Sequence, residues 1–265
     1  MATAMVTGGH SGIGAAFARA FAKRGVNLVL VARNSDRLEA VAAELRTSWN
    51  INVETLAVDL ADRAETLRLA ERLTDPARPV DVLVNNAGFG IRTRLLDPDT
   101  ATIERGLDVM CRAVLILGGT AGREMRQRGR GTIINVSSVS GAIAMGAYSA
   151  VKSWVTTYSE GLAVELAGTG VTVTALCPGW VRTNFHESAG INAAKIPSQL
   201  WLDADDVVEQ CLKDSARGKV ISVPSKRFTL LNWAARHLPR SVIRAVSARL
   251  SAGRSSPGSA GRSSP

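Results

Sequence analysis

The sequence predicts an α/β protein: a single-domain, doubly wound parallel sheet of the Rossmann type with a basic helical extension at its C-terminus. Short apolar runs alternate with helix-length segments along most of the chain. These runs lack the apolar–polar alternation of a half-exposed sheet, as expected for strands covered on both faces. A glycine-rich turn joins the first run to the first helical segment. Strands that alternate with helices imply parallel pairing through right-handed crossovers.

The expected elements follow in chain order. The strands are the apolar runs at residues 4–6, 26–32, 53–58, 80–84, 132–136, 171–176 and 220–223. The helices are the segments with helical spacing of apolar residues, at 15–24, 35–48, 63–73, 100–128, 148–166 and 203–215. In this architecture ligands bind beyond the carboxyl ends of the strands. That rule directs attention to residues 7–14, 85–90, 137–146 and 178–196.

The positive charge of the chain belongs to its C-terminal part. The formal net charge is +9, yet residues 215–265 contain ten basic side chains and no acidic one. We therefore divide the chain into a sheet domain at 1–225, a basic amphipathic extension at 226–250 and a tail at 251–265. The tail repeats SAGRSSP and has no large apolar residue, so it should be disordered.

The extension has two interpretations. Val242, Val246 and Leu250 fall on one helical stripe with the basic residues off it, which fits a helix that packs on the domain. Peripheral attachment to a membrane is the alternative. Nucleic-acid binding is not expected, because the basic segment contains no recognisable binding module.

Composition bounds the remaining classes. A chain of 265 residues can bury a full core, and it has no apolar run of about 18 residues that could span a membrane. The N-terminus leads directly into a strand, which leaves no room for a signal peptide. Cys111, Cys177 and Cys211 have neither metal-ligand spacing nor a paired framework. These features predict a cytoplasmic protein without a metal site, at the inner face of the membrane if the extension binds lipid.

The turn at residues 7–14 has the features of a phosphate cradle. Gly8 permits a tight turn, Gly12 lets the backbone approach a pyrophosphate, and Gly14 allows close packing of helix on strand. Glycine before a helix also occurs for steric reasons alone. Its place after the first strand favours a dinucleotide site.

A second signal is the pair Tyr148 and Lys152. Residues four apart share one face of a helix, so a phenol and an ammonium group lie side by side. The positive charge is expected to lower the pKa of the tyrosine toward a range useful for proton transfer.

Together, five motifs resemble the short-chain dehydrogenase/reductase family over residues 1 to about 225. They are TGxxxGxG at 7–14, NNAG at 85–88, Ser137-Ser138, YxxxK at 148–152 and Pro178-Gly179, in the family's order. The resemblance implies that Tyr148 is the general acid, that Lys152 tunes it and holds the nicotinamide ribose, and that Ser138 orients the carbonyl. It implies a nicotinamide cofactor bound by Gly8, Ser11, Gly12, Ile13, Gly14, Asp59, Leu60, Asn86, Ala87, Gly88, Tyr148, Lys152, Gly179, Val181 and Thr183.

Two positions depart from the family pattern. The central helix usually carries an asparagine that supports a proton-relaying water, and our alignment places Met110 there. A thioether cannot replace an amide as donor and acceptor, so the relay is weakened, rerouted or lost. Ser138 also precedes Tyr148 by only ten residues. The loop between them must be tight, and Gly141 and Gly146 can provide the backbone freedom.

The residues at the end of the second strand indicate which nicotinamide cofactor binds. An acidic side chain there would bind the ribose of NAD, but the chain has Ala32 and Arg33. Arg33 can clamp a 2′-phosphate through its planar guanidinium, although it could also be a solvated surface arginine. Asp36 is expected to belong to the following helix start. NADP(H) is therefore the predicted cofactor.

The leading hypothesis is an NADP(H)-dependent oxidoreductase that acts on a hydrophobic ketone, aldehyde or secondary alcohol. Trp180, Phe185 and Trp201 surround the segment that covers the substrate in such folds, although core packing explains the two tryptophans equally well. The alternative, prompted by Met110, is a non-catalytic or weakly active dinucleotide-binding protein. Relatives commonly pair through their long helices, so a homo-oligomer is expected.

Overall fold

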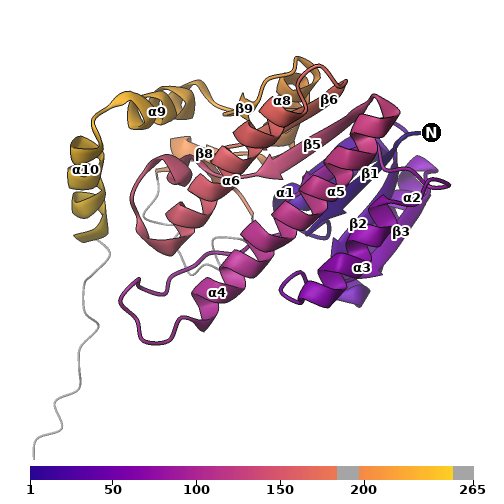
Figure 1. Cartoon of the computed structure of the whole chain (residues 1–265), viewed down its shortest axis with the longest axis horizontal. Helices are drawn as coiled ribbons and strands as arrows, with labels where there is room; N and C mark the ends of the chain where they lie inside the picture. Colours follow the sequence, from indigo (N-terminus) through magenta and orange to yellow (C-terminus); the bar gives the residue numbers. More distant parts are fainter. Residues whose placement is uncertain (184–196, 253–265) are drawn as a thin grey trace, which may run out of the picture.

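The computed structural model describes residues 1–183 and 197–252 (Figure 1). Residues 253–265 of the tail lie outside the described residues, as do Phe185 and the rest of 184–196. The last helix ends at Ala252, so the first two residues assigned to the tail continue that helix.

The described residues form the predicted parallel sheet of seven strands, in the order β3-β2-β1-β4-β5-β6-β9. Its strands are β1 (Thr3–Thr7), β2 (Asn27–Ala32), β3 (Val53–Ala57), β4 (Val82–Asn85), β5 (Gly131–Val136), β6 (Val171–Leu176) and β9 (Ile221–Ser222). The order reverses between β1 and β4. Such a switch point opens a crevice at the carboxyl ends of the strands, where ligands bind in this class of fold. A separate pair, β7 (Trp180–Val181) and β8 (Trp201–Leu202), was not predicted.

Helices cover both faces of the sheet, as predicted for doubly wound folds. The α-helices are α1 (Gly12–Ala22), α2 (Ser35–Trp49), α3 (Arg63–Leu73), α4 (Ala101–Leu107), α5 (Ala113–Arg128), α6 (Gly146–Glu165), α8 (Ala204–Ala216), α9 (Lys226–His237) and α10 (Arg240–Ala252). The short turns are a π-helical turn η1 (Asp108–Arg112) and the 3-10 turns η2 (Val139–Ala142) and η4 (Ser198–Leu200).

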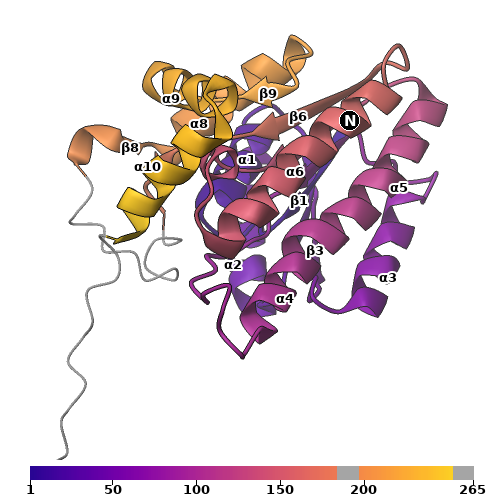
Figure 2. The same cartoon turned by 60° about the vertical axis from the view of Figure 1, so that its left-hand side comes forward.

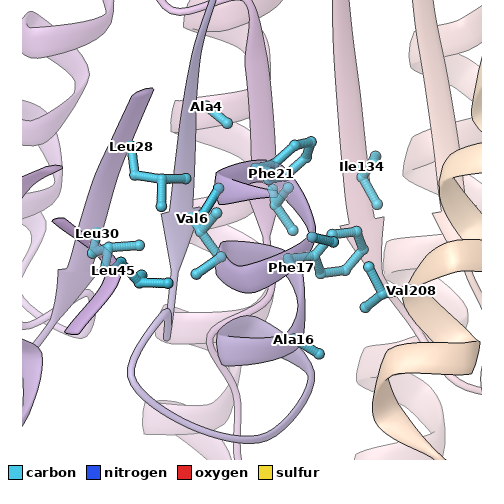
Figure 3. Packing of buried hydrophobic residues seen from close by; sticks show 14 of the residues in the cluster. Ala4, Val6, Ala16, Phe17, Phe21, Leu28, Leu30, Leu45, Ile134 and Val208 are labelled. Atoms are coloured by element: carbon cyan, nitrogen blue, oxygen red, sulfur yellow. The ribbon is translucent and has the colours of Figure 1, made fainter. Parts of the chain in front are cut away.

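The core has two layers because successive strand residues point to opposite faces of a sheet. Val6 and Ile134 pack with Phe17 and Phe21 of α1 and with Val208 of α8 (Figure 3). Their neighbours along the strands face the other layer; Met5, Leu83 and Ile133 pack there against residues of α3, η1, α5 and α6.

The segment 100–128, predicted as one helix, is divided by η1 into α4 and α5. A single π turn adds one residue to a helix that otherwise continues, so a period of 3.6 residues gives no sign of it. Arg112 donates to Asp108 across this turn at 2.5 Å. The turn buries Val109, Met110 and Cys111 in the interior.

The extension consists of α9 and α10, which lie at one end of the molecule (Figures 1 and 2). They are separated at Pro239, because proline disfavours helical backbone in the residue before it. The packing stripe that we predicted was wrong by one position. Val242 and Val246 are 41% and 45% exposed, whereas Ile243 and Ser247 are buried. Phe228 and Asn232 are also buried. This burial favours an extension that packs on the sheet domain over one that attaches to a membrane.

Within residues 1–183 and 197–252, every helix is too short or too polar to cross a membrane. The same residues contain no group of histidine, cysteine and acidic side chains suited to a metal ion.

Candidate active site

The glycine turn begins where β1 ends and leads into α1. Ser11 has extended backbone and is the N-cap of α1, so the N-terminus of this helix opens onto the turn, with Gly12 and Ile13 in its first turn. A Cβ on Gly14 would lie 2.2 Å from the carbonyl oxygen of Gly8. This approach excludes every side chain at position 14. The geometry is that of the predicted anion cradle at a helix N-terminus.

The loop after β4 is tied to the glycine turn. The Thr7 hydroxyl accepts hydrogen bonds from the backbone N–H groups of Asn86 and Ala87, at 2.9 and 3.0 Å. The Asn86 amide donates to the Thr7 carbonyl at 2.8 Å. Three of the expected cofactor residues, Asn86, Ala87 and Gly88, therefore border the glycine turn. Thr7 was not on our list of site residues, although its place before Gly8 was a usable signal.

Positive charge gathers at the outer end of the glycine turn. The Gly8 N–H donates to the Val31 carbonyl at 2.7 Å, so the end of β2, which Arg33 follows, lies beside the glycine turn. Burial and the charges of Arg37 and Arg33 lower the pKa of His10. Asn34 caps α2 by accepting from the Arg37 N–H at 2.8 Å. Asp36 lies in the first turn of α2, as expected. Arg37 is a second cation that the sequence analysis did not select, although it follows Arg33 by only four residues.

Asp59, expected to contact the adenine, already holds partners from its own chain. Its carboxylate accepts from Arg105 at 2.8 and 3.0 Å and from the Ala61 N–H at 3.0 Å. Burial raises the pKa of Asp59, but these donors outweigh it and leave the pKa below its ordinary value. Leu60, beside it, is buried.

Ser138 follows β5 and begins the tight loop that leads to α6. Its hydroxyl accepts from the Ser140 N–H at 3.1 Å and caps η2. Ser137 points inward and donates to the Lys152 carbonyl at 2.7 Å, a structural role. A Cβ on Gly141 would lie 2.8 Å from the Lys152 carbonyl carbon, and Gly146 has a φ of 72°. The short loop thus uses both glycines.

Tyr148 and Lys152 lie in the first turns of α6, with the Lys152 Nζ 5.7 Å from the centre of the tyrosine ring. Nζ donates to the Val136 carbonyl at 2.8 Å. The expected pKa shift of Tyr148 was wrong in direction. Burial raises the pKa of Tyr148 above its ordinary value and lowers that of Lys152 to about 8, because a low-dielectric site disfavours the charged form of each group.

Met110, at the position where the family pattern has an asparagine, is buried in η1. A Cβ on Gly88 would be 2.9 Å from the Met110 Sδ and 3.8 Å from the Lys152 Nζ. Met110 and Lys152 thus flank the same glycine, and both are buried. The thioether occupies the space beside the lysine without offering it a strong acceptor.

The residues after β6 complete the site. Thr183 lies against the glycine turn, since a Cβ on Gly12 would be 3.2 Å from its Cγ2. Val181 is buried in β7. Gly179 meets the ring of Phe228, whose nearest atoms would be 2.3 Å from a Cβ at position 179. Sequence reasoning missed Phe228, an isolated aromatic residue in a basic segment.

Five chain segments therefore meet at the carboxyl edge of the sheet. They are the turn after β1, the loops after β4 and β5, the start of α6 and the residues after β6. This is the arrangement the five motifs predicted. It can hold an extended phosphate-bearing molecule along the glycine turn with one end next to Lys152.

Comparisons with known proteins support the family that the five motifs indicate. The family model of the short chain dehydrogenases matches residues 2–193. An uncharacterized oxidoreductase of Staphylococcus saprophyticus is 34% identical over 212 residues, which cover 79% of this chain and 88% of that protein. A short-chain dehydrogenase from Sphingobium yanoikuyae, solved in complex with NADPH, has a TM-score of 0.80 at 30% identity, with 100% of each chain covered.

A bulky-bulky ketone specific alcohol dehydrogenase from Comamonas testosteroni has a TM-score of 0.76 at 26% identity, with 99% of this chain and 97% of that one covered. The family's oxidoreductases bind nicotinamide cofactors and act on small molecules. On these grounds the chain belongs to the short-chain dehydrogenase/reductase family.

Proposed function

We propose that the protein is an NADP(H)-dependent oxidoreductase that transfers hydride between the nicotinamide and a hydrophobic ketone, aldehyde or secondary alcohol. The observation that carries the cofactor choice is the pair of cations, Arg33 and Arg37, at the outer end of the glycine turn. The NADPH complex of the Sphingobium yanoikuyae relative supports it.

The glycine turn fits such a cofactor. Gly14 packs closely against the Gly8 carbonyl, and the N–H groups at the N-terminus of α1 would bind a pyrophosphate. Arg33 and Arg37 would bind a 2′-phosphate beyond it, where an NAD-specific site would place an acidic residue. Asn86, Ala87 and Gly88 would line the nicotinamide half next to Lys152, with Gly179, Val181 and Thr183 on the other side.

Three residues of this chain would carry the proton chemistry, while the bound cofactor supplies the hydride. Because burial keeps the Tyr148 phenol protonated, Tyr148 can donate its proton to the carbonyl oxygen of a substrate. Ser138 would hold that oxygen by a hydrogen bond. Lys152, whose ammonium form burial disfavours, would be stabilised in that form by ribose hydroxyls that accept its protons. A protonated phenol suits the direction of carbonyl reduction.

The apolar substrate class has two supports. Trp180 and Trp201 face each other across β7 and β8, with ring centres 6.3 Å apart. They lie beside the crevice, next to Val181. The Comamonas testosteroni relative is named for bulky ketones.

Cofactor choice is tested by the dissociation constants of NADPH and NADH. Arg33→Asp and Arg37→Asp should each weaken NADPH by roughly 10- to 100-fold, since a hydrogen bond to a charged group is worth about 1.5–3 kcal/mol. NADH binding should change little. Arg68→Asp, an exposed position on α3, is the matched control. An unchanged NADPH/NADH ratio in both site variants would overturn the NADP(H) assignment.

Turnover is tested with NADPH and a panel of ketones and aldehydes. Tyr148→Phe should lower kcat by roughly 100- to 10,000-fold, the usual contribution of a general acid, and leave NADPH binding intact. Ser138→Ala that kept full activity would contradict the role of Ser138.

A second candidate function, a non-catalytic or weakly active cofactor-binding protein, is favoured by Met110, which fills the place beside Lys152. Tight NADPH binding without turnover on the whole panel would select this function over the first.

We also propose that the protein is a homo-oligomer. Leu107, Leu115 and Val164 are large exposed apolar side chains on α4, α5 and α6, the long helices through which relatives commonly pair. Light scattering after gel filtration tests this, and a monomer at micromolar concentration would contradict it.

A further inference from the structure

A cavity of about 180 Å³ lies between α6, η2 and the two helices of the extension. Its walls include Ser138, Ser153, Thr157, Asn232, Arg236 and Arg240. Ser153 and Thr157 occupy a flank of α6 that is turned by roughly 140° from the flank of Tyr148 and Lys152. Tyr148 and Lys152 therefore point away from this cavity, which borders the active site only at Ser138.

The charge of this cavity is not balanced. Arg236 donates to both carboxylate oxygens of Glu160, at 3.2 and 3.3 Å, and this pair is neutral. Arg240 makes a single long contact, from Nη1 to the Ala142 carbonyl at 3.5 Å. Within residues 1–183 and 197–252 no acidic side chain pairs with Arg240. One positive charge thus remains at the cavity.

Asn232 contributes an amide to the same space. Its residue is 91% buried, being 9% exposed, and no side-chain hydrogen bond is formed by it within the described part of the chain. The amide atoms keep access to solvent through the cavity and can bind a ligand there. The hydroxyls of Ser153 and Thr157 add two further groups that can donate there.

A cation, an amide and hydroxyls around a small space match the needs of an oxyanion, which accepts several hydrogen bonds and carries negative charge. We propose that this cavity is a binding site for a small oxyanion, a phosphate or a carboxylate group, held by Arg240 and Asn232. Neither Tyr148 nor Lys152 lines the cavity, although Ser138 does. Because η2 forms one wall, the bound anion would also brace the loop that begins at Ser138.

The test is a melting-temperature titration of the full chain with inorganic phosphate, and separately with succinate, against chloride at constant ionic strength. A ligand that binds only the folded state raises the melting temperature in a saturable manner. We expect saturation with at least one of the two anions. The anion that saturates at the lower concentration identifies the group as phosphate or carboxylate. No saturable rise with either anion overturns the proposal.

Phosphate could also bind at the glycine turn, and variants separate the two sites. Arg240→Gln should weaken the response at least tenfold, while Arg244→Gln, exposed on the same helix, and Arg33→Gln should preserve it. Thr157→Val is a nearly isosteric change at an exposed position and should weaken anion binding several-fold. It replaces Arg240→Gln as the test variant if Arg240→Gln does not fold. A response that survives Arg240→Gln or Thr157→Val but disappears in Arg33→Gln places the anion at the glycine turn and overturns the proposal.

Discussion

Lys152→Met should stabilise the protein at neutral pH while it abolishes activity. Lys152 is 4% exposed, and burial lowers its pKa from 10.5 to about 8. Each pKa unit corresponds to about 1.4 kcal/mol, so holding the ammonium group in this site costs roughly 3 kcal/mol of folding free energy. Methionine removes the charge at similar length. Loss of the hydrogen bond from the charged Nζ to the Val136 carbonyl destabilises the variant by about 1.5–3 kcal/mol. The net gain is therefore at most roughly 1.5 kcal/mol.

The pH dependence gives the sharper measurement. Between pH 8 and 10.5 the unfolded chain binds more protons at Lys152 than the folded protein does, so the stability of the native sequence rises with pH in this window. The advantage of Lys152→Met should be constant below pH 8 and disappear as the pH approaches 10.5.

Urea unfolding of both proteins across this range measures the difference, with exposed Lys213→Met as the control. Other groups titrate alike in the two proteins and cancel. A variant that is less stable at pH 7, or a difference that does not vary with pH, would refute the reasoning.

The remaining predictions concern three other positions. Met110→Asn should raise the rate of carbonyl reduction at saturating NADPH, because an amide beside Lys152 can support a proton-relaying water; an unchanged or lower rate counts against the relay. Gly14→Ala should abolish cofactor binding or folding, since its Cβ would lie 2.2 Å from the Gly8 carbonyl oxygen, and a variant that binds NADPH normally would show the turn to be wrongly described. Phe228→Ala should destabilise the protein by about 3–5 kcal/mol, measured by urea unfolding; a loss below 1 kcal/mol would mean that the ring is not a core contact of Gly179.

The sheet could be predicted from the sequence because buried parallel strands are short apolar runs with no competing pattern. The main helices could also be predicted, because their apolar residues have helical spacing. The π turn at Asp108–Arg112 was not, since one inserted residue leaves the flanking pattern intact. Pro239 also indicates that the extension is divided into two helices, but the sequence analysis did not use this residue.

Within the site, motif residues came together as expected at the carboxyl edge of the sheet. The pKa of Tyr148 could not be predicted, because it depends on burial and not on the spacing to Lys152 alone. Arg105, the partner of Asp59, lies 46 positions away in the sequence. Such a long-range pair has no local signature.

The contacts of the extension bear on any attempt to redesign specificity. The family model ends at residue 193, yet Phe228 seats on Gly179 and Ser247 accepts the Ala144 N–H at 3.2 Å. Two loops beside the crevice are thus held by residues that lie beyond the end of the family model. Chimeras or grafted loops need to carry the last helices along with the segments they support.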